Sequence, residues 1–302
     1  MNSLFVALRN IWEKNGPEAY AALTGGFPSF VTAKNPAKLD SNIPVFCYHI
    51  VNEQLFAEDL EFLVRNDYVS IDADTMLRHL QGKEKAPDNS IVITFDDGAQ
   101  NLYDVAYPLL KKYNKKAIVF IAPRFHVPAV KADNDLLTPL TWEQIREMHE
   151  SGVFDFQSHT MEHRYIPRWP EFVELAGADP EIVNALLKQP LSMEEDFRLS
   201  REIIERKLNK KVLHLAFPKF FGNDKAIQSG QMTGYEGFWW GVLSGRSGNE
   251  FGQSPDRIVR LEAQFIRRLP GKGRVSLASI LTKRYAGSVV RYKNKLLKKG
   301  RA

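Results

Sequence analysis

Two acidic residues in the sequence stand where they could do hydrolytic chemistry. Asp96 and Asp97 follow directly on the apolar run 91–95 and precede Gly98. Gly98 allows a sharp turn, so both carboxylates can face one cavity instead of opposite faces of a strand. An Asp-Asp-Gly sequence is also a common plain turn, which is the alternative interpretation.

Two histidines four residues apart form a second candidate group. His159 and His163 lie in the run SHTMEH, directly after another predicted strand. In the first turn after a strand, residues at this spacing can present both imidazoles to one ion. The alternative is two unrelated surface histidines. One carboxylate and two imidazoles with open positions would form a catalytic site for zinc, or for iron, cobalt or nickel.

These four side chains allow a division of roles. Asp97, His159 and His163 would hold the ion, which would lower the pKa of a bound water from about 9 toward about 7. Asp96, free of the ion, would take a proton from that water as the general base. The nearby cation would keep the Asp96 carboxylate ionised at neutral pH.

Alternating strand and helix patterns predict the elements that position these residues. Short apolar or β-branched runs predict strands at 43–48, 68–71, 91–95, 117–121, 153–157, 212–217 and 238–243. Helical spacing predicts helices at 56–64, 74–80, 102–113, 141–150 and 192–208, with a capping box from Thr141 to Gln144. The pattern implies an α/β fold, a distorted (β/α) barrel of mainly parallel strands with outer helices, whose strand ends would gather both groups at one rim.

The chain divides into three predicted parts. Residues 1–40 form a helical extension and a Gly/Pro-rich linker, residues 41–270 the catalytic domain, and residues 271–302 a basic helical tail. Residues 164–191 look like an insertion beside the site, either a lid or a plain surface loop. The single cysteine, Cys47, excludes an intramolecular disulfide framework. No apolar run approaches the roughly 20 residues needed to span a bilayer.

Charge is unevenly distributed along the chain. From Arg257 onward there are 14 Lys and Arg residues against one acid, whereas the preceding part holds 27 basic and 35 acidic residues. The basic end predicts an acidic partner or an anionic membrane surface, and a solvated tail is the alternative. Residues 276–300 mix apolar and basic residues as interfacial helices do. Without a recognised nucleic-acid motif, these basic residues do not predict nucleic-acid binding.

The N-terminus predicts where the protein resides. It lacks a basic n-region, and Arg9, Glu13 and Lys14 interrupt its apolar stretch, so it makes a poor secretory signal. We therefore expect a cytoplasmic protein, with peripheral attachment to the inner membrane face as the alternative.

The sequence resembles the polysaccharide deacetylases, the NodB-homology family of carbohydrate esterases. The resemblance runs from about residue 44 to about residue 260, and its most specific parts are TFDDG at 94–98 and SHTMEH at 158–163. Tyr48-His49, LLKKYNKKA at 109–117 and AFP at 216–218 support it. It implies a distorted barrel of about seven strands and N-acetylated sugars as substrates. It also implies that the first acid is the base and that the second acid and both histidines are metal ligands.

The sequence departs from the family pattern at the residue that donates a proton to the leaving amine. Many members carry a late histidine that protonates the leaving amine, whereas no histidine follows His214 here. His49, just past the first strand, is our candidate for this role, and capping of the adjacent loop is the alternative. We expect His214 to be a hydrogen-bonded core residue. No group of catalytic or metal-ligating residues accompanies the three other histidines in the sequence, and we assign no role to His79, His126 or His149.

A second departure follows the AFP run, in a loop that shapes the acetyl pocket in the family. An aromatic residue and a glycine are usual there, but this chain has Lys219-Phe220-Phe221-Gly222. We predict that Phe217, Pro218 and Lys219 contact the substrate, Lys219 through an oxyanion or an acidic group, with a solvent-facing lysine as the alternative. Trp239 offers a stacking surface for a sugar, and a core position is its alternative.

The predicted activity is metal-dependent hydrolysis of the N-acyl amide of an amino sugar, in a glycan or a lipid-linked saccharide. Two alternatives remain. One is a non-catalytic, metal-containing carbohydrate-binding relative, which the missing late histidine suggests. The other is a metal hydrolase for a non-sugar amide, which the same four residues allow.

Overall fold

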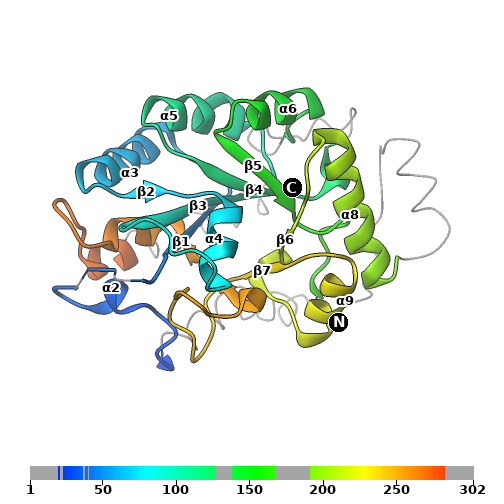
Figure 1. The fold of residues 1–302 in the computed structure, drawn as a ribbon. Helices are drawn as coiled ribbons and strands as arrows, with labels where there is room; N and C mark the ends of the chain where they lie inside the picture. Colours follow the sequence, from blue (N-terminus) through cyan, green and yellow to red (C-terminus); the bar gives the residue numbers. More distant parts are fainter. Residues whose placement is uncertain are drawn as a thin grey trace, which may run out of the picture.

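A computed structural model describes residues 20, 23–36, 38–39, 41–126, 138–166 and 191–282. Their strands form one parallel sheet in the order β8-β7-β6-β5-β4-β3-β1-β9, with β2 paired to β3, and the sheet curls into a nearly closed barrel (Figure 1). The strands are β1 Val45–Tyr48, β2 Val69–Ser70, β3 Ser90–Asp96, β4 Ala117–Ile121, β5 Phe154–Ser158, β6 His214–Ala216, β7 Gly237–Trp240, β8 Ile258–Val259 and β9 Leu261–Glu262.

Helices surround the barrel, and α4 packs onto the lumen residues at the end where the strands begin (Figure 1). The α-helices are α2 Ser29–Thr32, α3 Glu53–Arg65, α4 Ala73–Leu80, α5 Tyr107–Lys112, α6 Trp142–Glu150, α8 Met193–Leu208 and α9 Asp224–Met232. A π-helical turn, η1 Leu102–Ala106, leads into α5. Short 3-10 turns are η2 Pro123–Phe125, η5 Pro218–Phe220, η6 Pro255–Arg257 and η7 Ala263–Arg268.

The two edges of the sheet meet at a single residue. Strand β8 pairs with β7 at one edge and β9 pairs with β1 at the other, and only Arg260 separates β8 from β9. The main chain itself therefore bridges the gap in the barrel. We call this point the seam.

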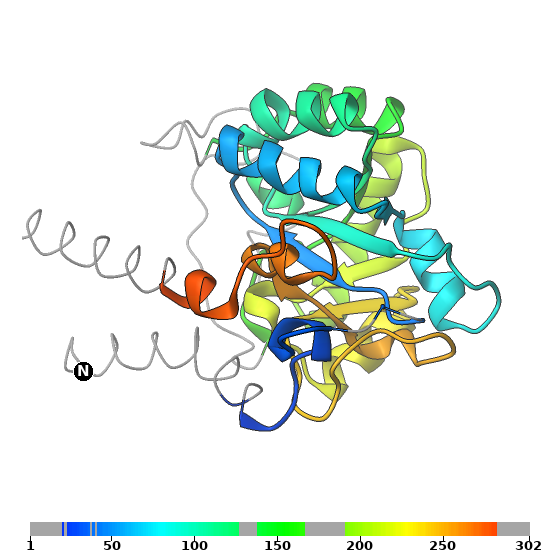
Figure 2. The same cartoon turned by 90° about the vertical axis from the view of Figure 1, so that its left-hand side faces the viewer.

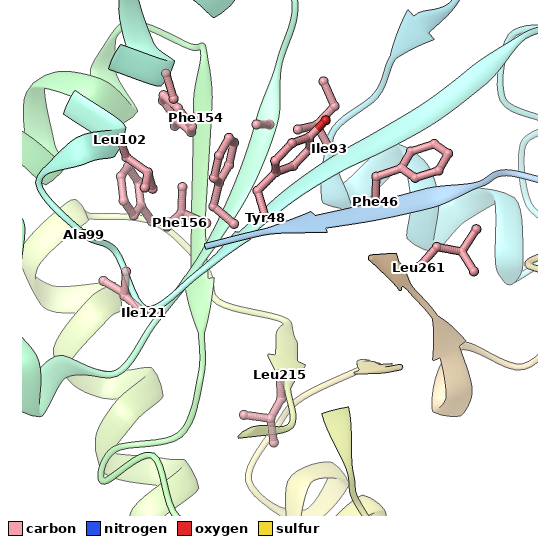
Figure 3. Close-up of a cluster of buried hydrophobic side chains, with 14 of the residues drawn as sticks. Phe46, Tyr48, Ile93, Ala99, Leu102, Ile121, Phe154, Phe156, Leu215 and Leu261 are labelled. Carbon is pink, nitrogen blue, oxygen red and sulfur yellow. The ribbon is translucent and has the colours of Figure 1, made fainter. Parts of the chain in front are cut away.

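Alternating side chains of the strands divide the core in two. Outward-facing residues such as Phe46, Ile93 and Phe156 pack under the helices (Figure 3). Inward-facing residues, including Phe120 and Trp239, fill the lumen. Because both faces of each strand are buried, the strands read as continuous apolar runs.

The predicted fold class is confirmed, and the predicted strands and helices are present. The capping box at Thr141 and Gln144 is present, and Ser192 and Glu195 form a second one at α8. The predicted helix at 102–113 is divided into η1 and α5. Helix α9 and the two-residue strands β8 and β9 were not predicted from the sequence.

Both ends of the described chain pack against the barrel on one side (Figure 2). Phe30 and Val31 of α2 and Ile280 belong to the buried core, and the Phe27 ring lies 5.3 Å from that of Phe265. The packed body thus extends beyond 41–270 in both directions. The predicted tail beyond residue 282, most of the extension 1–40 and most of the insertion 164–191 lie outside the described residues. Among the helices that are described, we find none with the length and apolar character to cross a membrane.

Candidate metal centre

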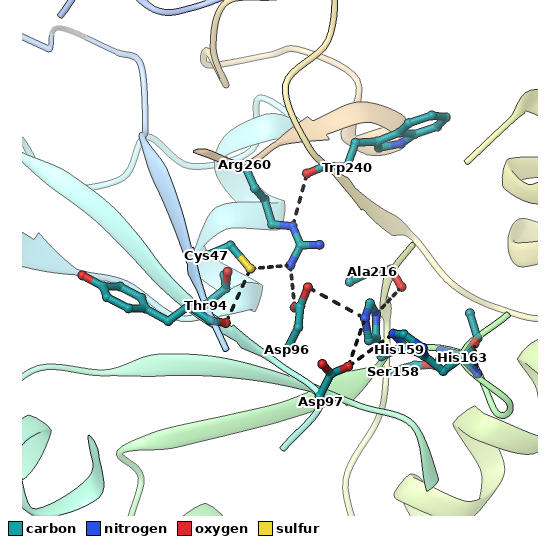
Figure 4. A network of polar contacts seen from close by, with 12 residues as sticks. Cys47, Thr94, Asp96, Asp97, Ser158, His159, His163, Ala216, Trp240 and Arg260 are labelled. Atoms are coloured by element: carbon teal, nitrogen blue, oxygen red, sulfur yellow. Dashed lines mark hydrogen bonds and ion pairs between the residues drawn. The ribbon is translucent and has the colours of Figure 1, made fainter. Parts of the chain in front are cut away.

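The two sequence groups meet at the end of the barrel where the strands terminate (Figure 4). Asp96 is the last residue of β3 and Asp97 follows it, while His159 follows the last residue of β5. Strand β4 lies between β3 and β5, so side chains from both strand ends can meet above it. This arrangement is the one predicted from the strand pattern.

Asp97, His159 and His163 form a compact three-residue cluster. Their ligand atoms all lie within 4.8 Å of one another. Asp97 Oδ1 lies 3.3 Å from His163 Nε2 and 3.8 Å from His159 Nε2. His159 Nδ1 donates to the carbonyl oxygen of Ala216 at 2.8 Å, which leaves the Nε2 lone pair facing the cluster.

The donor set fits a divalent metal ion. Asp97 Oδ1 is buried and has no hydrogen-bond partner in the described part of the chain. A buried, unpaired carboxylate oxygen is costly unless a cation or donor satisfies it. Burial and the neighbouring His159 lower the pKa of His163 to about 4, so this imidazole is neutral and able to act as a ligand at neutral pH.

A tight turn aims Asp97 at the cluster. Asp97 and Gly98 have φ values of 71° and 68°, in the left-handed region. A Cβ on Gly98 would lie 2.7 Å from Cε1 of His126, so the turn leaves no room for a side chain there. His126, which the sequence analysis left without a role, supports this turn from behind and donates through Nδ1 to the Leu140 carbonyl.

Helix α8 holds the loop that carries the two histidines. Both carboxylate oxygens of the buried Asp196 accept main-chain N–H groups, from Met161 at 2.8 Å and from Glu162 at 3.0 Å. One turn later, Ser200 Oγ lies 2.8 Å from Ser158 Oγ. The contact of this helix with the site was not predicted from the sequence.

Asp96 lies beside the cluster and is paired with a buried cation. Its Oδ1 accepts a hydrogen bond from Arg260 Nη1 at 2.7 Å, while Oδ2 lies 3.8 Å from His159 Nε2 (Figure 4). Burial alone would raise the pKa of Asp96, but Arg260, with smaller contributions from His159 and His49, holds it well below its ordinary value. Asp96 is therefore a carboxylate at neutral pH.

Arg260 is the main site residue that the sequence analysis missed. It lies at the seam, is 1% exposed, and donates from Nε to the Trp240 carbonyl at 3.2 Å. Its Nη1 also lies 3.6 Å from Cys47 Sγ, and its guanidinium lies over the rings of Phe120 and Phe220. In the sequence, Arg260 belongs to the basic end of the chain that begins at Arg257. Its position inside the apolar run at 258–261 is the sequence feature that could have indicated a buried arginine.

The structure places His49 at the mouth of the site. His49 is exposed, and its ring lies 6.2 Å from that of Phe220. It contributes to the low pKa of Asp96, so the two side chains are electrostatically close. This position agrees with the predicted proton donor, and that role stays a prediction.

The AFP segment contributes to the site through its main chain. The Ala216 carbonyl orients His159, whereas the buried Phe217 ring faces outward, stacked against Phe238 and packed edge-on against Trp240. Phe217 and the buried Pro218 therefore offer no exposed side chain to a substrate, which corrects the contact predicted for them.

The residues after the AFP segment turn back over the rim. Lys219 and Phe220 have φ values of 56° and 69°, a strained conformation for residues with side chains. Lys219 is exposed, and its Nζ lies 5.0 Å from the centre of the Tyr165 ring, two residues after His163. Lys219 thus lies against the segment that follows His163, and its contact with the substrate stays a prediction.

Trp239 lies in the lumen and does not reach the rim. It is fully buried, packs on Phe120, and donates through Nε1 to His214 Nδ1 at 3.1 Å. A sugar ring cannot stack on a side chain in this position, so the predicted stacking role is wrong. The expectation that His214 is a core histidine is confirmed, since it is also fully buried.

Comparisons with known proteins agree with this geometry. A model of the family described as "Polysaccharide deacetylase" matches residues 83–238. The Bacillus subtilis protein YxkH is 24% identical over 221 residues, covering 69% of this chain and 66% of the relative. A poly-beta-1,6-N-acetyl-D-glucosamine N-deacetylase of Staphylococcus epidermidis is 27% identical over 186 residues, covering 62% and 59%. The chain thus spans less than two thirds of the length of each of these relatives.

Solved structures show the same fold. A de-N-acetylase from Aggregatibacter actinomycetemcomitans aligns with a TM-score of 0.57 at 22% identity, covering 73% of this chain and 94% of that chain. IcaB from Ammonifex degensii aligns with a TM-score of 0.58 at 21% identity, covering 74% and 91%.

Proposed function

Because the chain belongs to the polysaccharide deacetylase family, we propose that it hydrolyses the N-acetyl amide of an amino sugar in a glycan or a lipid-linked saccharide. The observation that carries the proposal is the separation of two carboxylates at one strand end. Asp97 joins two histidines in a cluster whose donor atoms could hold a metal ion, while Asp96 stays off that cluster, ion-paired to Arg260.

The proposed mechanism assigns one function to each side chain. A divalent ion held by Asp97, His159 and His163 would supply a Lewis acid and lower the pKa of water. Asp96 accepts the proton of the attacking water at Oδ2, because Arg260 already occupies Oδ1. Arg260 fixes the carboxylate and keeps it ionised. We propose zinc first, and iron, cobalt or nickel as other ions for this donor set.

Breaking the C–N bond requires a proton on the leaving amine. We propose His49 as its donor, since it lies at the open mouth of the site and within electrostatic reach of Asp96. Asp96 then carries the proton taken from water, the amine carries the proton given by His49, and both side chains return to their starting states by proton exchange with solvent. This assignment makes His49 the general acid and Asp96 the general base.

The names of two relatives support the substrate class. The Staphylococcus epidermidis relative is named as acting on poly-beta-1,6-N-acetyl-D-glucosamine, and the Aggregatibacter protein as a de-N-acetylase. We propose a β-linked N-acetylglucosamine polymer or a related saccharide, with Lys219 at the rim contacting the substrate. The cytoplasmic location and the attachment of the basic tail to an anionic membrane stay part of this proposal. Loss of residues after Thr282 should then weaken sedimentation with anionic vesicles, and unchanged sedimentation would refute the attachment.

The proposal is tested by measuring acetate released from N-acetylglucosamine oligomers and from an aryl acetate, with and without a chelator. We expect chelator-sensitive release from the oligomers, reduced roughly 10²- to 10⁴-fold in Asp96→Asn. Asp104→Asn, the same change at an exposed residue eight positions later, is the matched control and should retain activity. Metal-loaded protein that releases acetate from neither compound would favour the carbohydrate-binding alternative. Cleavage of the aryl acetate but of no oligomer would favour the non-sugar hydrolase.

A further inference from the structure

A second cavity lies away from the metal cluster, between the two ends of the described chain. Its volume is about 680 Å³, within the range of small-molecule sites. One wall comes from the segment after α2 and the other from the segment after η7, which lie together on one side of the barrel (Figure 2). The polar residues lining it are Thr32, Lys34, Asn35, Arg268, Arg274 and Ser276.

Two arginines join the walls of this cavity. The guanidinium of Arg268 donates three hydrogen bonds to main-chain oxygens and that of Arg274 donates four, all at 2.7–3.0 Å. The acceptors are the carbonyl oxygens of Phe30, Val31, Ala33, Lys34, Arg268 and Val275. A guanidinium can donate five bonds, so both groups retain N–H donors for a further acceptor.

The positive charge in this cavity has no acidic partner in the described part of the chain. No lining residue is acidic, and no ion pair involves Lys34, Arg268 or Arg274 there. Arg268 is 3% exposed, and burial together with the adjacent Arg274 lowers its pKa. Two neighbouring guanidiniums in a partly desolvated place repel each other, and an anion between them would relieve that repulsion.

We propose that this cavity is a binding site for a phosphate ester. Arginine forks match the geometry of phosphate oxygens, and a phosphate charge of about −1.5 to −2 balances two guanidiniums better than a single carboxylate does. The cavity is larger than a phosphate group, so the ligand carries an organic group as well. Lys34, which is exposed and lines the cavity, adds a third positive charge. A phospholipid headgroup and a soluble sugar or glycerol phosphate share this chemistry.

Binding is measured on the full-length protein at pH 8, by calorimetry and thermal shift with inorganic phosphate and with glycerol 3-phosphate. Sodium chloride at equal ionic strength is the reference. We expect a phosphate-specific rise in Tm and a loss of affinity of at least about tenfold in Lys34→Glu. Lys38→Glu is the matched control, because Lys38 is also exposed but lines a separate cavity, and the affinity of this variant should remain that of the wild type.

Sedimentation with phosphatidylcholine vesicles, with and without phosphatidate, separates the two sources. Weaker phosphatidate-dependent sedimentation of Lys34→Glu than of Lys38→Glu assigns the site to a lipid headgroup. Equal sedimentation, together with lost glycerol 3-phosphate binding, assigns it to a soluble ester. No phosphate effect beyond that of chloride, or equal binding by the two variants in all assays, overturns the proposal. None of these measurements depends on hydrolysis, so failure of the proposed phosphate site and failure of the proposed activity can be distinguished.

Discussion

Replacing Arg260 with methionine removes the cation that faces Asp96 while approximately keeping the volume of the side chain. The two groups are 2.7 Å apart, and their side chains are 0% and 3% exposed. The change leaves Asp96 as a buried carboxylate without its main counter-charge. It should therefore affect both the stability of the barrel and the ionisation of the base.

The size of the effect follows from this geometry. Two unit charges 2.7 Å apart attract by about 6 kcal/mol at an effective dielectric constant of about 20. The cost of desolvation offsets part of this attraction, and breaking one side of a buried pair typically costs about 3–5 kcal/mol. For a chain of this size we expect a fall in Tm of roughly 6–20 °C.

The ionisation of Asp96 should change in a defined direction. In the wild type its pKa is depressed, so its ionised form stabilises the fold above the unfolded pKa of about 3.9 and that stability is lost only at much lower pH. Without Arg260, burial raises the pKa, and Asp96 takes up a proton at a higher pH. The acidic limb of the pH–rate profile should therefore move upward in Arg260→Met.

A double-mutant cycle in urea separates the ion pair from other effects. Arg260→Met is measured in the wild type and in Asp96→Asn, where the carboxylate charge is absent. The matched control is Arg257→Met, three residues earlier, whose ion pair with Asp224 is exposed and should contribute less than about 1 kcal/mol.

We expect a coupling free energy of at least about 2 kcal/mol between Arg260 and Asp96 and none between Arg257 and Asp96. Additivity of Arg260→Met and Asp96→Asn within about 0.5 kcal/mol would show that Arg260 stabilises the fold through packing alone. An unchanged acidic limb would refute its proposed effect on the base.

Three further predictions concern other parts of the molecule. Asp59 is half-buried and accepts a hydrogen bond from the Tyr48 hydroxyl, and desolvation raises its pKa to about 7, so the free energy of unfolding should fall as pH rises from about 4 to about 7. In urea titrations, Asp59→Asn should raise the free energy of unfolding at pH 8 by up to about 4 kcal/mol, and this increase should vanish below pH 4. An increase that does not depend on pH would contradict the raised pKa as its cause. His49→Gln should slow amide hydrolysis roughly 10²- to 10⁴-fold but spare an aryl acetate, whose leaving group needs no proton, and equal effects on both would exclude the proton-donor role. Gly98→Ala places a Cβ 2.7 Å from Cε1 of His126, at a φ of 68°. It should lower the free energy of unfolding by about 2–4 kcal/mol in denaturant titrations. It should also weaken zinc binding, measured in competition with a chelator. Wild-type stability would show that the turn can relax.

The barrel and the metal cluster were predictable because their signals are local. The candidate residues stand at the end of a strand or shortly after one, each strand is identified by its own composition, and parallel strands bring their ends to one rim; they are Asp96, Asp97, His159 and His163. Arg260 is different, because its partner Asp96 lies 164 residues earlier and β8 and β9 are only two residues long. No periodic pattern exists in such short strands.

The sequence also did not predict which way the aromatic side chains of the strands point. In a barrel strand both the lumen and the helix-facing side are apolar, so alternation does not identify which residue meets solvent. Trp239 consequently lies in the lumen and Phe217 under the helices, although both were predicted at the substrate. The position of Lys219 depends on a strained turn that composition does not reveal.

The seam has a consequence for the order in which the molecule becomes active. A nascent chain that has left the ribosome as far as residue 257 already contains the proposed base and all three candidate ligands. It still lacks the strand pair that joins the two sheet edges, and with it the guanidinium that keeps Asp96 ionised. Hydrolysis should therefore begin only after the last part of the barrel has been synthesised and docked, so that completion of the fold and readiness of the base are one event.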